Sequence, residues 1–316
     1  MHSSTPPPPD RSDSDGTVDG VEAFLDAIVA APDERPPTSP LSDLDRPATT
    51  LLRDRWDEIP MTTRIRIVRD MAQDAEDHVE RHYQRALLVA CRDSDPDVRL
   101  AAFDGLWEFD SPELLRILLS EIAEEPDARV REAMATGLGR FAADSDDDLA
   151  LNEVLEALFE RWEGDSAIDV RRRALESLGF LSGDDIVEAI EDAYNNHSIE
   201  IRASALQAMG RQGDNRWLDA CLRELRSDDP ELRFEAVTAL GSIGDQRTVS
   251  AIVDMTDDED VEVALAAIAA LGEVGGPMAV NRLRQLSEDQ SRAVAEAAAD
   301  ALQEASIMAN PLRPLM

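Results

Sequence analysis

A pattern of about 31 residues recurs along most of this chain, and the repetition limits the fold more than any other feature of the sequence. The copies are DPDVRLAAFDGLW (95–107), DARVREAMATGLG (127–139), AIDVRRRALESLG (167–179), SIEIRASALQAMG (198–210), DPELRFEAVTALG (229–241), DVEVALAAIAALG (260–272) and SRAVAEAAADALQ (291–303). Their fifth positions are Arg99, Arg131, Arg171, Arg202, Arg233, Ala264 and Ala295, so the successive spacings are 32, 40, 31, 31, 31 and 31 residues. A spacing that holds over four steps indicates a repeat architecture, in which each unit contacts mainly its neighbours.

Each copy has the pattern of one helix. Most copies begin with a good N-terminal capping residue, namely Asp95, Asp127, Ser198, Asp229, Asp260 or Ser291. Apolar and small residues then follow four apart, as in Leu232, Ala236 and Leu240, and form one helix face. We expect a glycine to end the helix in a left-handed conformation in five copies, at Gly139, Gly179, Gly210, Gly241 and Gly272.

A second helical stretch lies between consecutive copies, for example VLEALFERW or DIVEAIEDAY. Each unit is therefore expected to be two antiparallel helices whose apolar faces are buried only when neighbouring units stack. The predicted fold is all-α, a right-handed α-solenoid of about seven helix pairs with an N-terminal helical cap.

The sequence predicts four regions, namely the repeat array and three segments outside it. Residues 1–45 are an acidic, proline-rich tail, expected to be mostly disordered with a short helix at 19–31. Residues 46–80 are cap helices, residues 81–306 are the repeat array and residues 307–316 are a C-terminal tail. Trp107 replaces the glycine that ends other copies, and we expect it to cover the junction between cap and array.

The charge of the chain excludes several classes of function. The sequence has 67 Asp and Glu residues against 31 basic residues, all of them arginine, and a net charge of −36. Such a surface repels nucleic-acid phosphates and anionic membranes, so neither is an expected partner. Adaptation to a salt-rich cytoplasm explains the acidity, because salt screens the repulsion; recognition of a basic partner is the alternative.

The start of the chain and its apolar content indicate a cytoplasmic protein. The first residues have no basic and then apolar segment, and no apolar run reaches 18 residues. Cys91 and Cys221 lie in apolar helical contexts and are expected to be reduced core thiols.

The repeats resemble HEAT repeats of the short kind that is also called PBS-lyase HEAT-like. The resemblance rests on a D-P-x-V-R start and an A-L-G end, seen here as Asp95, Pro96, Val98 and Arg99 and as Ala239, Leu240 and Gly241. It covers roughly residues 81–305, and residues 46–80 resemble the cap of a full-length prokaryotic group of such proteins. The resemblance implies an α-solenoid that acts as a protein–protein scaffold, and it is more specific for fold than for function.

The resemblance also implies a structural ladder, in which an arginine reaches the Asp or the turn carbonyls of the adjacent unit. Arginine suits such forked contacts better than lysine would. The residues of this ladder would be Asp95, Arg99, Asp127, Arg131, Arg171, Arg202, Asp229 and Arg233.

The exposed side of the repeat helices is the predicted partner-binding surface, since solenoids usually bind on their concave face. The candidate residues are Arg129, Glu132, Thr136, Arg172, Arg173, Glu176, Gln207, Phe234 and Thr238. Three of them form a basic island on an acidic molecule, and Phe234 is an outward aromatic beside Thr238. A solvated surface with salt bridges such as Arg172–Glu176 is the alternative.

The sequence offers little material for catalysis. His78 and His82 share a helix face, but the glutamate that a metalloprotease motif requires after the first histidine is absent. Deoxyhypusine hydroxylase, an enzyme built on HEAT-like repeats, holds two irons with His-Glu dipeptides, and this chain has none. We therefore expect no catalytic, metal or cofactor residues, and a monomeric, non-enzymatic scaffold for another protein. The alternatives are an enzyme or enzyme subunit resembling a bilin lyase or metal-dependent hydroxylase, and a nucleic-acid-binding solenoid that uses Arg129, Arg172 and Arg173.

Overall fold

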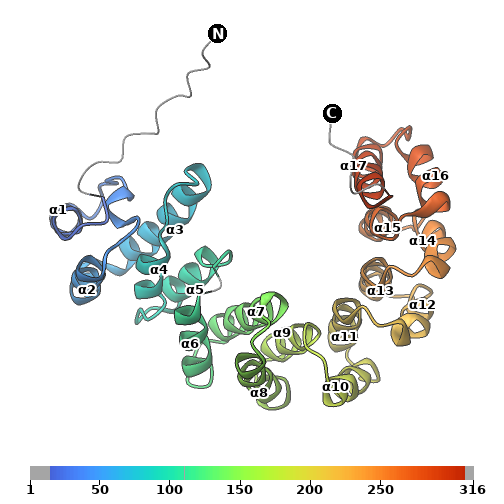
Figure 1. Ribbon diagram of the computed structural model, residues 1–316, viewed down its shortest axis with the longest axis horizontal. Helices are drawn as coiled ribbons and strands as arrows, with labels where there is room; N and C mark the ends of the chain where they lie inside the picture. The colour runs from blue at the N-terminus through green and yellow to red at the C-terminus, as the bar shows by residue number, and fades with distance from the viewer. Residues whose placement is uncertain (1–14, 110, 310–316) are drawn as a thin grey trace, which may run out of the picture. The chain divides into compact units, whose positions relative to one another are not determined.

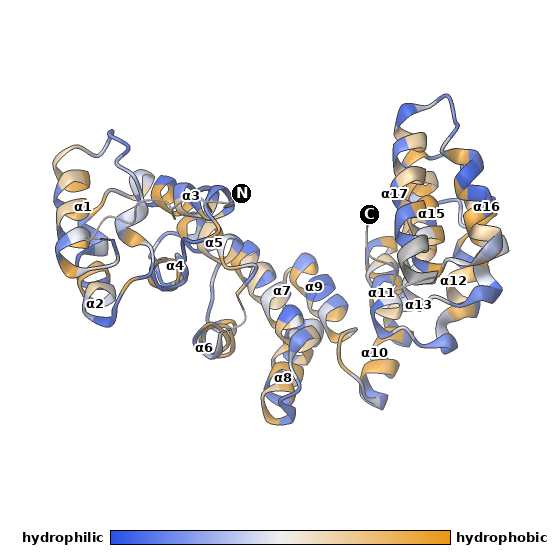
Figure 2. Ribbon diagram, turned by 45° about the horizontal axis from the view of Figure 1, so that its top comes forward, coloured by the Kyte–Doolittle hydropathy of each residue, from blue (hydrophilic) through white to orange (hydrophobic). Residues whose placement is uncertain are grey.

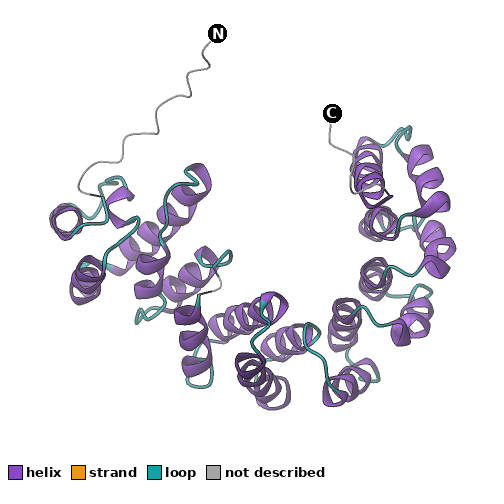
Figure 3. Cartoon of the chain, in the orientation of Figure 1, coloured by secondary structure: helices purple, strands orange, loops and turns teal. Residues whose placement is uncertain are grey.

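The computed structural model describes residues 15–109 and 111–309 of the chain. These residues form 17 α-helices and four 3-10 turns and include no strand, which confirms the all-α prediction (Figure 3). The chain divides into two compact units, with the boundary in the sequence between Gly137 and Leu138.

The first unit is built from helix pairs in two layers. Its elements are α1 (Val18–Ala30), α2 (Arg46–Arg55), α3 (Met61–Asp77), α4 (Gln84–Ala90), α5 (Pro96–Gly105), α6 (Pro112–Glu121) and the first part of α7 (Ala128–Asp144). Helix α2 packs against α4 in one layer, and α3 packs against α5 in the other (Figure 1).

Residues 15–45 are folded, contrary to the expectation that this segment is mostly disordered. The expected helix is present as α1, and it buries Val21, Phe24, Leu25 and Ile28, whereas Val29 is 39% exposed. The loop that follows is tied to the body of the unit, since the Asp43 amide donates to the His82 carbonyl over 2.8 Å. Leu41 and Leu44 are buried and add apolar contacts that stabilise this loop. The expectation of disorder rested on the overall composition of the segment, which does not show where single apolar residues are buried. Residues 1–14 of the expected tail lie outside the described residues.

The second unit repeats the same arrangement of two packed helices five times. Its elements are α8 (Asp148–Gly164), α9 (Ile168–Leu178), α10 (Asp184–Tyr194), α11 (Ile199–Gln212), α12 (Leu218–Glu224), α13 (Pro230–Ile243), α14 (Val249–Met255), α15 (Val261–Val274), α16 (Gly276–Leu286) and α17 (Arg292–Ala309). Helices α9, α11, α13, α15 and α17 pack successively side by side and form the inner row of this unit (Figure 1). Helices α8, α10, α12, α14 and α16 form its outer row. Helix α17 passes the expected end of the array at residue 306, and the rest of the expected tail, 310–316, lies outside the described residues.

Hydrophobic side chains of both rows are buried between the helices. Val263, Ala267 and Leu271 of α15, which lie four apart in the sequence, are all buried. Figure 2 shows hydrophobic and hydrophilic residues alternating along the helices of this unit, as expected for helices with one buried face.

The repeated glycine allows close helix packing and does not form the predicted left-handed helix end. Gly210, Gly241 and Gly272 lie inside α11, α13 and α15. A Cβ atom on Gly210 would lie 2.9 Å from the Cα atom of Ala239 on the next inner helix, which is too close for any side chain. Gly139 faces Ser177 in the same way, and Gly179 faces Ala208 with a φ of −59°. The left-handed helix ends lie three residues later, at Gly213 and Gly244, with φ of 62° and 73°.

The two cysteines are buried and form no disulfide. Burial raises the pKa of Cys91 well above its usual range and that of Cys221 to about 12. Both thiols are therefore protonated and unreactive in the folded protein. Within the described residues, no helix is long and apolar enough to span a bilayer.

Candidate functional site

The repeat arginine joins consecutive repeats through a turn residue that the sequence analysis did not single out. Arg233 donates from Nε and Nη2 to the two carboxylate oxygens of Asp258, both over 2.9 Å, and from Nη1 to the Ser227 carbonyl. Asp258 in turn accepts the backbone N–H of Asp260, the N-cap of α15. One carboxylate therefore fixes the start of a helix and holds the preceding repeat.

For Arg99 and Arg233 the acceptor lies two residues before the N-cap of the next repeat helix, and not at the N-cap as predicted. Seven such side chains accept the backbone N–H of their N-cap residue, namely Asp93, Glu125, Asp165, Asn196, Ser227, Asp258 and Asp289. Arg99 forks onto Glu125 as Arg233 does onto Asp258, with distances of 2.8 and 2.6 Å. Asp95, Asp127 and Asp229, the acids expected in the ladder, instead cap their own helices.

The ladder begins one helix pair earlier than the repeats visible in the sequence. Arg64 of α3 donates to Asp93 over 2.7 Å, and it follows Pro60, the N-cap of α3, by four residues, as Arg99 follows Asp95. Helices α2 and α3 therefore pair in the same register as the later repeats, although the cap was predicted as a separate region.

The remaining ladder arginines use other acceptors. Arg171 donates to the Trp162 carbonyl over 2.9 Å and lies over that indole ring. Arg202 pairs with Glu224 over 2.8 Å and lies over the ring of Tyr194. Arg131 donates to the carbonyl groups of the turn before its own helix.

Four candidate partner-binding residues of the second unit form a polar network with Ser204. The buried carboxylate of Glu176 accepts from Arg173 over 2.6 Å and from the Ser204 hydroxyl over 2.7 Å. Arg172 donates to the same hydroxyl over 3.0 Å, and the Gln207 amide faces Glu176 at 2.6 Å with its nitrogen toward the carboxylate. The salt bridge expected between Arg172 and Glu176 is thus replaced by one between Arg173 and Glu176. The hydrogen-bonding groups of these side chains are paired with one another, and the pairing holds α9 and α11 together at this point.

A second carboxyl group lies beside this network on α13. Burial, together with the negative charges of Glu176 and Glu231, raises the pKa of Glu235 to about 7. On α11, burial lowers the pKa of Arg211, whose guanidinium group lies 4.7 Å from the centre of the Phe180 ring. The charge of Glu235, and with it the net charge of this part of the inner row, therefore changes near neutral pH.

The other candidate residues are divided between the two units. Arg129, Glu132 and Thr136 belong to the first unit, and Arg129 pairs there with Asp97 and Asp127 over 2.8 and 2.9 Å. Phe234 and Thr238 belong to the second unit, and both are half-buried on α13. The predicted basic island is thus divided between the two units, with Arg129 in ion pairs within the first unit and Arg172 and Arg173 in the second.

A large groove lies on the first unit between α3 and α5, and it is called the Trp107 groove below. It has a volume of about 1070 Å³, and its hydrophobic lining includes Val79, Leu100, Trp107 and Phe109. Trp107 is 59% exposed and Val79 is 85% exposed. Arg69, Glu76 and Arg129 also line it. Trp107 thus lies between cap and array as expected, but it leaves the junction open. Its place where other repeats have glycine was the only sequence signal for this groove.

The histidine pair has the surroundings of surface residues. His78 lies 3.6 Å from Glu80 and 3.9 Å from Asp74, and about half of its side chain is exposed. The described part of the chain has no group of three or more His, Cys, Asp or Glu side chains placed to hold a metal ion.

Comparisons with known proteins identify the repeat family and a solved structure of similar fold. The family model for HEAT repeats matches residues 84–156, 155–224 and 218–303. The complex of CpcE and CpcF of phycocyanin lyase from Nostoc sp. PCC7120 is similar in structure, with a TM-score of 0.50 and 15% identity over 70% of this chain and 94% of that one. An engineered protein matches with a TM-score of 0.42 and 16% identity over 93% and 92% of the two chains. Human deoxyhypusine hydroxylase in complex with glycerol matches with a TM-score of 0.36 and 18% identity over 90% and 97%. At such identities these likenesses concern the fold alone, and no curated protein matches the sequence.

Proposed function

We propose, since this chain belongs to the HEAT-repeat family, that it is a non-enzymatic scaffold that binds another protein in a salt-rich cytoplasm. The fold supports this role, because stacked helix pairs present long, rigid surfaces without needing a catalytic centre.

The Trp107 groove is the observation that carries the proposal. An exposed tryptophan in a groove with further hydrophobic lining loses contact with water when a partner side chain enters. Tryptophan and arginine are the residues most often found at the energetic centre of protein interfaces, and Arg69 and Arg129 lie at the same groove. The surface therefore has the composition of an interface, with an apolar centre and a charged rim.

The network around Glu176 supports a second contact area on the second unit. Its side chains are held by mutual hydrogen bonds, so a partner would meet a preorganised polar surface. Half-buried Phe234 on the neighbouring helix adds an aromatic contact. The proposed partner surface of this unit therefore consists of the half-buried predicted residues Arg172, Arg173, Gln207, Phe234 and Thr238, whereas the predicted residue Glu176 is buried beneath them and holds Arg173 in place.

The test is affinity capture at high salt followed by measured binding of the purified partner to the full chain. We expect Trp107→Ala to weaken binding about 30-fold, the effect of losing a hot-spot side chain worth about 2 kcal/mol. The matched control is Val261→Ser, because Val261 is a well-exposed hydrophobic residue of the second unit. A partner that binds the Trp107→Ala protein with unchanged affinity would show that the groove is not the contact surface.

Metal content separates the scaffold from an enzyme resembling a metal-dependent hydroxylase. We expect protein purified without chelators to contain no stoichiometric iron or zinc. One bound metal ion per chain that is lost in the double variant His78→Ala and His82→Ala would overturn the scaffold proposal and favour the enzyme.

A further inference from the structure

A second groove on the first unit concentrates arginine side chains on a strongly acidic chain. It has a volume of about 600 Å³ and is lined by five arginines, which define the arginine groove: Arg46, Arg53, Arg85, Arg92 and Arg116. Only two carboxylate residues, Asp57 and Glu113, line it as well. The chain as a whole has more than two acidic residues for each arginine, so this groove inverts the charge of its surroundings.

Regular helical spacing on three successive helices produces the groove. Helix α2 contributes positions 46, 49, 50 and 53, α4 and the residue after its C-cap contribute 85, 88, 89 and 92, and α6 contributes 113, 116 and 117. Residues spaced by three, four and seven share one helix face, so each helix presents the same kind of stripe. Arginines occupy the ends of the stripes on α2 and α4, and Leu88, Val89 and Ile117 lie between the charged groups.

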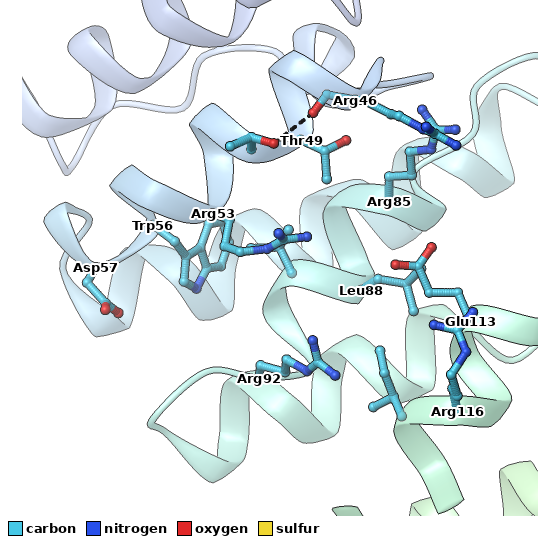
Figure 4. A pocket seen from close by; sticks show the side chains of 13 residues that line it. Arg46, Thr49, Arg53, Trp56, Asp57, Arg85, Leu88, Arg92, Glu113 and Arg116 are labelled. Atoms are coloured by element: carbon cyan, nitrogen blue, oxygen red, sulfur yellow. Dashed lines mark hydrogen bonds between the residues drawn. The ribbon is translucent and has the colours of Figure 1, made fainter. Parts of the chain in front are cut away.

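Three of the five guanidinium groups have no ion-pair partner among the described residues, namely those of Arg46, Arg53 and Arg116. Arg85 donates to the Leu44 carbonyl over 2.5 Å, and Arg92 pairs with Glu121 over 2.8 Å. Figure 4 shows Arg53 and Arg92 extending into the groove from two sides.

The nearest acids do not neutralise this charge. Asp57 is already 3.1 Å from Arg64, so Glu113 is the only lining carboxylate outside that pair. Like charges held together without counter-charges repel one another, and an anion between them removes the repulsion. An arrangement of this kind is therefore suited to a negatively charged ligand.

We propose that the arginine groove binds an acidic peptide segment of a partner protein, one in which Asp or Glu alternates with apolar side chains. The guanidinium fork matches the two oxygens of a carboxylate. Leu88, Val89 and Ile117 also line the groove, and although each is at most 7% exposed, together they provide a small apolar floor that a bare polyphosphate would not contact favourably. A duplex nucleic acid would also meet the net charge of −36 outside the groove. The proposal does not rest on the Trp107 groove, which lies on α3 and α5.

The test uses the full chain and a short fluorescein-labelled peptide in which Glu and Leu alternate, with binding measured by fluorescence anisotropy. We expect the double variant Arg53→Glu and Arg116→Glu to weaken binding at least tenfold, because two charge-assisted hydrogen bonds to peptide carboxylates are replaced by repulsion between like charges. The matched control is Arg226→Glu with Arg284→Glu, which makes the same change in net charge at two exposed arginines of the second unit. The control is expected to bind within twofold of the unchanged chain.

Further arms of the test identify the ligand class. A peptide with Ser in place of Leu is expected to bind more weakly, and Trp107→Ala is expected to leave peptide binding unchanged. Failure of the unchanged chain to bind the peptide, or equal losses in the two double variants, would overturn the proposal. Tighter binding of tripolyphosphate or duplex DNA than of the peptide would overturn it in favour of a phosphate site. If the charge reversals prevent folding, Arg53→Gln with Arg116→Gln replaces them, and the same loss is expected.

Discussion

The guanidinium group of Arg233 forks onto the carboxylate of Asp258, which lies 25 residues further along the chain and fixes the first turn of the next repeat helix. The two side chains are only 9% and 8% exposed. Burial opposes ionisation of Asp258, but the hydrogen bonds from Arg233 and from the Asp260 N–H, together with the positive charge of Arg233, outweigh it and lower the pKa of that carboxyl group. The pair therefore remains charged at neutral pH and links two repeats.

Removal of Arg233 is expected to destabilise the second unit strongly. Arg233→Ala leaves Asp258 charged and buried, and we expect a loss of about 3 kcal/mol in the free energy of unfolding, measured by urea denaturation at high salt. Asp258→Asn should cost less than Asp258→Ala, because the amide oxygen can still accept the Asp260 N–H. The control is Arg247→Ala, which breaks an ion pair at the surface and should cost less than about 1 kcal/mol. Similar losses for Arg233→Ala and Arg247→Ala would contradict the role of the ladder.

The same substitution at two helical glycines is expected to have opposite effects. Gly210→Ala places a methyl group against the backbone of Ala239 and should lower the melting temperature, because α11 and α13 must move apart. Gly164→Ala adds a methyl group with no atom within 4 Å, so it should leave the melting temperature unchanged or raise it. Thermal unfolding followed by circular dichroism measures both. A Gly210→Ala protein as stable as the original would refute close packing at this position.

Glu235 is expected to make the folded protein less stable as the pH rises. Its pKa of about 7 in the folded state exceeds the usual 4.5, so between these values the folded protein binds a proton that the unfolded chain releases. Stability is unaffected by this group below about pH 4.5, falls as pH rises toward 7 and then stays reduced. The penalty is at most about 3.5 kcal/mol, because each pH unit between the two values contributes about 1.4 kcal/mol.

Glu235→Gln is expected to remove this penalty. The variant should melt at a higher temperature than the original chain at pH 8 and at the same temperature near pH 4. Exposed Glu188 on α10 provides the control, since Glu188→Gln makes the same change in net charge away from the network. A melting difference that does not depend on pH would show that Glu235 titrates normally.

The net charge of −36 predicts that the fold requires salt. The Debye length falls from about 10 Å at 0.1 M salt to about 3 Å at 1 M, so repulsion between surface carboxylates is largely screened at the higher concentration. We expect the melting temperature to rise steeply over this range, and sucrose of equal osmotic strength to raise it much less. A melting temperature that is independent of salt would count against adaptation to high salt.

The repeat period was enough to predict the helix pairs, because the periodic apolar residues are those that neighbouring helices bury. The sequence did not reveal the position two residues before the N-cap, because it is Asp, Glu, Asn or Ser in different repeats. These residues share only a side-chain oxygen that accepts a hydrogen bond. The glycine column was misinterpreted because a glycine near a helix end suits both a left-handed cap and a close contact, and only the neighbouring backbone distinguishes them.

The binding surfaces could be predicted less well than the fold. Trp107 drew attention as a departure from the repeat, but the size of its groove depends on how α3 and α5 pack. The arginine groove combines three helices that are far apart in the sequence. On α2 and α4 its arginines are at both ends of the stripe of lining residues, whereas on α6 the single arginine follows Glu113 within the stripe. Sequence patterns within single helices do not reveal such combinations.

The turn acceptors have a mechanical consequence for the second unit. Because Asp258 holds both Arg233 and the start of α15, a tilt of one repeat pulls directly on the next. Asp289 caps its turn in the same way, but the residue at the preceding arginine position is Ala264, so that link is missing. Bending forces should therefore pass stiffly through α13 and α15 and be absorbed between α15 and α17, which makes the last repeat the compliant end of this stack.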